Sequence, residues 1–75
     1  MKIVSKKSDS SILCVTDGDV TYGGNPPEDC DVHDIPGWDW SLVDLSGVDK
    51  SAPFWVKKCL MWSGSNIVKR IPPLP

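Results

Sequence analysis

The sequence of 75 residues lacks the features that would assign it to a familiar class of protein. No apolar run approaches the roughly 20 residues that cross a bilayer. Residues 1–4 lead into Ser5 and Lys6 instead of the apolar stretch of a secretory signal. The three cysteines are an odd number, which argues against a disulfide framework. We therefore expect one small domain over residues 1–75, located in the cytoplasm, with reduced cysteines and no contact with a membrane.

Basic residues are missing from the middle of the chain. Between Asp17 and Asp49 there are nine acids and no Lys or Arg, whereas residues 1–16 carry a net charge of +2 and residues 50–75 one of +5. Either the flanks fold back and neutralise the middle, where exposed pairs contribute little, or the middle forms a negative surface that attracts a basic partner. The eight basic residues are too few and too scattered to follow a phosphate backbone, so we expect no direct binding to nucleic acid.

Large aliphatic residues are also scarce, but there are four tryptophans. A chain of this size rarely gains more than about 3–5 kcal/mol from its core. Because each tryptophan buries roughly 150–250 Å², we expect some of them in the core.

The patterns of the chain predict a small α+β domain, with an all-β fold as the alternative. Residues 2–6 suit a short strand, and residues 11–16 and 20–22 flank Asp17-Gly18, a strong hairpin signal. Residues 28–37 keep no period and predict a long acidic loop. Residues 54–62 suit either a short helix, capped by Ser51 and ended at Gly64, or a strand. A turn over residues 63–66 then leads into a last strand, followed by a proline-rich tail at residues 71–75.

Residues 38–52 contain a short repeat. Written in fives, each unit has an apolar residue, Asp and, after one variable position, Ser. This resembles pentapeptide-repeat proteins, whose units wind into a β-helix and some of which imitate DNA with an acidic face. The resemblance covers fifteen residues, and it implies that Asp39, Asp44 and Asp49 lie at regular intervals on one side.

Two sets of residues suggest chemistry. Cys30 and His33 have the spacing of paired zinc ligands, with Cys14 and Cys59 as further candidates. His33 beside acids and Cys30 could also act as base and nucleophile, but neighbours on a loop are poorly preorganised for catalysis. We therefore expect no enzyme activity, no metal site and no cofactor, and we retain a zinc-stabilised module as an alternative.

The function that the sequence predicts is that of a non-enzymatic binding protein, an inhibitor or regulator whose acidic surface binds a basic protein that handles nucleic acids. The tryptophans of the acidic middle are candidate anchors, because aromatic residues dominate interface hot spots. The predicted partner-binding residues are Asp29, Asp31, Asp34, Trp38, Asp39, Trp40 and Asp44. An adaptor whose proline-rich tail docks on an aromatic groove is a second alternative.

Overall fold

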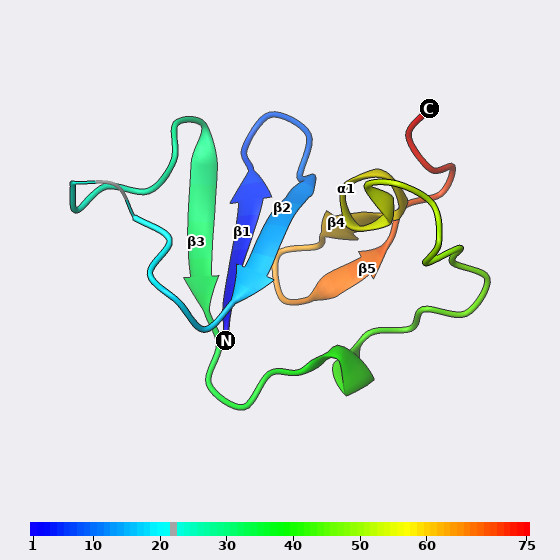
Figure 1. Cartoon of the computed structure of the whole chain (residues 1–75), viewed down its shortest axis with the longest axis horizontal. Coiled ribbons are helices and arrows are strands. Elements are labelled where there is room, and N and C mark those ends of the chain that lie inside the picture. Colours follow the sequence, from blue (N-terminus) through cyan, green and yellow to red (C-terminus); the bar gives the residue numbers. More distant parts are fainter. Residues whose placement is uncertain (22) are drawn as a thin grey trace.

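The computed structural model describes residues 1–21 and 23–75 and shows two antiparallel sheets with one short helix. The first sheet has the strand order β2-β1-β3, and the second pairs β4 with β5 (Figure 1). This arrangement confirms the predicted small α+β domain. No helix in residues 1–21 and 23–75 is long and apolar enough to span a membrane.

The N-terminal hairpin joins β1 (Lys2–Lys6) to β2 (Ile12–Thr16). Both strands were predicted, but the turn was not, because the hairpin was expected across Asp17-Gly18. Residues 17–21 are not a strand, and Tyr22, the end of the expected second strand, lies outside the described residues. Thr16 Oγ1 accepts the Gly18 N–H, and Asp19 accepts the Thr21 N–H. These local side-chain bonds occupy backbone donors that a strand would need.

Strand β3 (Cys30–Asp34) pairs with the other side of β1, with Val32 opposite Val4 and Asp34 opposite Lys2. The prediction of a loop over residues 28–37 is therefore wrong at its centre. The acids in this strand obscured its period of two, since strands are usually recognised from alternating apolar residues. Asp31 and Asp34 are compatible with this strand because both of their side chains are exposed to solvent.

The second sheet is formed by β4 (Leu60–Trp62) and β5 (Ile67–Lys69), directly after helix α1 (Trp55–Cys59). Residues 54–62 thus combine both predicted alternatives. Ser51 does not cap the helix: the N-cap is Phe54, which is left-handed with a φ of 58° and makes no capping bond through its side chain. Gly64 lies in the turn between β4 and β5 with a φ of 94°, not at the helix exit.

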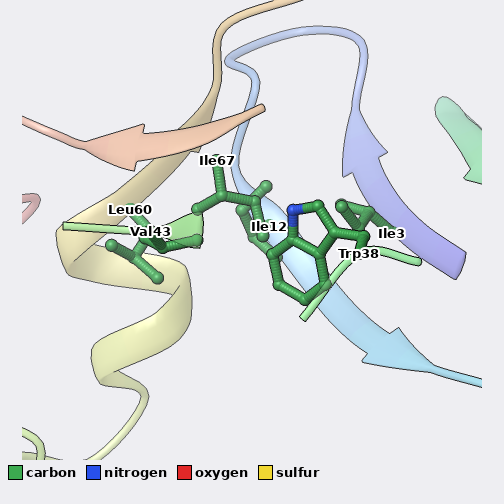
Figure 2. Packing of buried hydrophobic residues seen from close by; sticks show 6 residues of the cluster. All are labelled: Ile3, Ile12, Trp38, Val43, Leu60 and Ile67. Carbon is green, nitrogen blue, oxygen red and sulfur yellow. The ribbon is translucent and has the colours of Figure 1, made fainter. Parts of the chain in front are cut away.

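A single core holds the two sheets together. Ser11 bridges to Met61, and the Trp62 N–H donates to Ser10 O at 2.8 Å, so β4 lies beside β2. The long segment of residues 35–54, which contains the 3₁₀ turn η1 (Trp40–Leu42), contributes Trp38 and Val43 to the buried cluster. Figure 2 shows these two side chains with the rest of the cluster, namely Ile3, Ile12, Leu60 and Ile67.

Candidate interaction surface

Strand β3 is an outer strand of its sheet, since its pairing partner in the sheet is β1 (Figure 1). The Lys7 N–H donates to Asp29 O at 2.8 Å and the Ile35 N–H to Met1 O at 3.0 Å, at the two ends of the β1–β3 ladder. Hydrogen-bonded pairs alternate in antiparallel sheets. The backbone groups of Asp31 and His33 therefore face β1, and those of Val32 and Asp34 point outward.

The outward backbone groups of Val32 and Asp34 form what we call the open edge of β3. In the part of the chain that the structure describes, no hydrogen bond outside the β1–β3 ladder uses them. Of the segment that precedes β3, Asp19, Val20 and Pro27 line a cavity of about 420 Å³ with Val4, Leu13, Cys14 and Thr16. An unpaired edge of this kind is a template for another strand.

Side chains of β3 alternate between the two faces of the sheet. His33 lies on the core side, where its Nε2 is 2.8 Å from Ser5 Oγ and its ring stacks on Trp62 with the centroids 4.1 Å apart. Asp31, on the same side, is 3.7 Å from Lys7 Nζ, and both side chains are more than half exposed. Asp34 is exposed and points to the other face.

The turn before β3 adds two more acids, Glu28 and Asp29. Asp29 adopts a left-handed φ of 60°, and the Cys30 N–H closes the turn by donating to Pro27 O at 3.2 Å. Within residues 1–21 and 23–75, neither Glu28 nor Asp29 nor Asp34 has a cationic group within 4.0 Å of its carboxylate. We call Glu28, Asp29, Asp31 and Asp34 the β3 acidic surface.

The acids of the five-residue repeat have a local structural role. Asp39, Asp44 and Asp49 each accept the backbone N–H of the serine two positions later. Asp39 and Asp49 also accept that serine's hydroxyl. These hydrogen bonds hold the pKa of Asp39 and Asp49 below the ordinary range. The repeat thus forms a series of Asx turns.

Asp44 has the largest shift of the three. The hydrogen bonds from Ser46, reinforced by Lys69, lower its pKa to about 2. Lys69 Nζ lies 3.3 Å from the carboxylate and also donates to Ser46 O at 2.9 Å. One lysine of the basic C-terminal segment therefore pairs with one acid of the acidic middle.

A simple rule separates the ten acids of the chain. Every Asp with Ser or Thr two positions later accepts that residue's backbone N–H; these are Asp9, Asp19, Asp39, Asp44 and Asp49. Of the remaining five, Asp17 lies 3.4 Å from the N-terminal amine. The other four are Glu28, Asp29, Asp31 and Asp34, the members of the β3 acidic surface. Acids without a local hydrogen-bonding role are thus concentrated around one strand.

The predicted partner-binding residues do not form one group. Asp29, Asp31 and Asp34 belong to the β3 acidic surface, whereas Asp39 and Asp44 lie in the segment between β3 and α1. Trp38 is 5 % exposed and belongs to the core, and its indole donates to Asn66 Oδ1 at 2.8 Å.

Trp40 is half-buried between two other indoles. Its ring lies edge-on to Trp38, with the centroids 5.2 Å apart, and near Trp55 at 6.0 Å. Trp38 therefore lies in the core, and Trp40 presents only part of its ring to solvent.

Cys30 and His33 lie on opposite faces of β3, because residues three apart in a strand point in opposite directions. They cannot hold one ion together in this fold. In residues 1–21 and 23–75 no three His, Cys, Asp or Glu side chains group as a metal site. The three cysteines are free: Cys14 is exposed, Cys59 is half-buried and Cys30 is buried.

Ser5 and His33 have the distance of a nucleophile and its base, but Ser5 is 3 % exposed. The stacked indole of Trp62 covers one face of the imidazole. Nucleophilic catalysis needs a nucleophile that a substrate can approach, and this hydroxyl is enclosed. The pair therefore acts as a satisfied polar contact between β1 and β3.

The proline-rich tail folds back on the helix. The Leu74 N–H donates to Lys58 O at 2.9 Å, and Leu74 and Pro75 line a cavity of about 240 Å³ with Phe54, Lys57 and Lys58. To serve as an extended ligand, the tail would have to leave these contacts.

No family model, no curated protein and no solved structure matches this chain.

Proposed function

We propose that this chain is a non-enzymatic binding protein whose β3 acidic surface docks on a basic region of another protein. The observation that carries the proposal is that acids without a local hydrogen-bonding role are concentrated around one strand, β3. The carboxylates of Glu28, Asp29, Asp31 and Asp34 accept no hydrogen bond from the described residues, and among these residues only Asp31 has a cationic group within 4.0 Å. Four exposed carboxylates in seven residues create a local negative potential.

Such a surface acts mainly on the rate and the specificity of association. Complementary charge steers the encounter between two proteins and disfavours wrong partners more than it adds affinity. Proteins that handle nucleic acids carry basic surfaces, so an inhibitor or regulator of such a protein is the form of this function that we favour. The other half of the acidic middle contributes less, because Asp44 is already paired with Lys69.

The proposal is tested by removing charge at β3 without changing shape. One variant carries Asp29→Asn, Asp31→Asn and Asp34→Asn. A matched control carries the same three replacements at Asp39, Asp44 and Asp49, whose asparagine side chains keep an oxygen that can accept the Asx-turn bond. Both variants lose the same charge, so a general effect of net charge affects them equally.

The two variants and the parent chain are each used for affinity purification from the native cell, followed by mass spectrometry. We expect a protein that the parent and the control retain and that the β3 variant loses. With that protein in hand, the β3 variant should associate more slowly than the control at low salt, with a flatter dependence on ionic strength. Equal retention and equal association rates for the folded variants would reject the β3 acidic surface as the contact.

A further inference from the structure

We propose that the partner contributes an extended segment that adds as an antiparallel strand to the open edge of β3. This inference rests on the proposed function, because it takes the β3 acidic surface as the contact. It adds the geometry of binding and the chemistry of the segment. The occupant is a stretch of another protein with basic residues at a fixed spacing.

The backbone of β3 supplies the first argument. Val32 and Asp34 direct their N–H and C=O groups away from β1, and no other described residue bonds to them. Peptides that add to a sheet edge gain affinity from such main-chain bonds, and they gain specificity from side chains at alternating positions. The strand runs from Cys30 to Asp34, which is an ordinary strand length.

The side chains of β3 predict the spacing of the segment. Asp31 and Asp34 are three positions apart, so they lie on opposite faces of the sheet. Directly opposite residues on neighbouring strands have their Cβ atoms roughly 4.5–5.5 Å apart. A segment with Lys or Arg opposite each acid therefore has two basic residues separated by two others. The residue opposite Val32, which is half-buried, should be apolar.

Two other occupants fit less well. A second copy of this chain paired along the same edge would bring two β3 acidic surfaces together, and like charges across neighbouring strands are destabilising. The segment that precedes β3 has other contacts among its described residues: Gly18 O accepts from Lys2 Nζ at 3.2 Å, and Val20 and Pro27 border a cavity beside Cys14. None of its described residues forms a backbone hydrogen bond with Val32 or Asp34.

A synthetic peptide tests the inference directly. The probe has about eight residues, a common strand length, with Lys-Thr-Val-Lys at its centre and neutral, capped ends. Its first lysine is designed to lie opposite Asp34, its valine opposite Val32 and its second lysine opposite Asp31. A control peptide has the same composition but places the two lysines two positions apart, so that both lie on one face.

Two further peptides probe the backbone. N-methylation of the valine removes an N–H that faces β3 in the proposed register, whereas N-methylation of the threonine removes one that faces away. We expect the first change to abolish binding and the second to leave it within about twofold. Hydrogen exchange of the complex should show new protection of the Val32 and Asp34 amides. The Asp31 and His33 amides already bond to β1 and should change little.

The possible results separate this inference from the proposed function. Binding that needs the three β3 aspartates but tolerates both N-methyl groups, without new amide protection, would overturn strand addition and leave the acidic contact standing. If the Lys-Thr-Val-Lys peptide does not bind to β3, the predicted spacing of the partner segment is wrong. The purification experiment then still tests whether the β3 acidic surface binds a partner. Protection of Val32 and Asp34 that rises with protein concentration alone would replace the partner segment by a second copy.

Discussion

The side chain of Asn66 connects the turn between β4 and β5 to the segment that follows β3. Its Oδ1 accepts the indole N–H of Trp38 and the N–H of Ile67, each at 2.8 Å. Its Nδ2 donates to Leu42 O at 2.9 Å. We predict that Asn66→Ala destabilises the domain more than any exposed substitution in the same turn.

The magnitude follows from these three bonds. Trp38 is 5 % exposed, so its indole N–H would be left buried and unsatisfied, which costs about 1–3 kcal/mol. The bond to Leu42 is exposed and the bond to Ile67 is partly buried, and each adds about 0.5–1 kcal/mol. The total of about 2–5 kcal/mol is comparable to the roughly 3–5 kcal/mol available to a domain of this size. The variant should therefore be partly unfolded at room temperature.

Urea unfolding followed by tryptophan fluorescence measures the effect. Asn66→Asp keeps both acceptor functions and loses only the bond to Leu42, so it should cost about 1 kcal/mol. Ser65→Ala, at an exposed neighbouring position, should change little. In a background with Trp38→Phe, which lacks the indole N–H, Asn66→Ala should cost at least about 1 kcal/mol less, because the two groups interact directly. A cost for Asn66→Ala below about 1 kcal/mol, or the same cost in both backgrounds, would refute this account.

Three further predictions concern acid stability, backbone strain and thiol reactivity. Hydrogen bonds from Ser46 help to lower the pKa of Asp44 from 3.8 to about 2. The ionised carboxylate therefore stabilises the folded state above about pH 4, and this stabilisation is lost as the pH falls through 2. In thermal melts Asp44→Asn should flatten the stability loss between pH 4 and pH 2, and an unchanged acid limb would contradict the assignment. Phe54 is 74 % exposed with a φ of 58°, so Phe54→Gly should leave stability unchanged or raise it by up to about 1 kcal/mol, whereas the β-branched Phe54→Val should lower it; chemical unfolding of both variants decides. Partial desolvation raises the pKa of Cys14, but its side chain is exposed, whereas Cys30 is buried. A small alkylating reagent above pH 8 should therefore modify Cys14 before Cys30, as measured by mass spectrometry of the digested protein. The reverse order would contradict the packing of β3.

The elements that the sequence predicted are those with local apolar signals. Residues 2–6 and 12–16 carry the Ile and Val of β1 and β2, and residues 67–69 those of β5, so their extended form was visible. The pairing of β1 with β2 was missed because Asp17-Gly18 offered a stronger turn signal than residues 7–11. In the structure Ser10 provides that turn with a left-handed φ of 62°, which is uncommon for serine.

Strand β3 was missed for a different reason. Its residues alternate between the two faces, yet the acids at positions 31 and 34 removed the apolar contrast that marks a half-buried strand. Charged residues on an outer strand are a common way to discourage unwanted pairing. In the proposed strand addition, the same carboxylates that hid the strand in the sequence also restrict which segment can join it, and they favour a basic one.

For the ten acids, the local hydrogen-bonding role could be predicted from the sequence, whereas their position at an outer strand could not. An aspartate with Ser or Thr two positions later can be recognised without coordinates as an Asx-turn former, and all five such aspartates behave so here. Applying that rule to the acidic middle would have removed Asp39 and Asp44 from the predicted partner-binding set and left residues 28–34 as its centre. The sequence could not show that these remaining acids lie in or directly before a strand whose outer side is unpaired among the described residues, because that depends on β1 being shared between β2 and β3. An acidic segment in a loop offers only charge, whereas the same segment in an outer strand also offers a row of backbone donors and acceptors. In the proposed mode of binding, the fold therefore adds to a general attraction for basic proteins a requirement for an extended segment with a defined spacing.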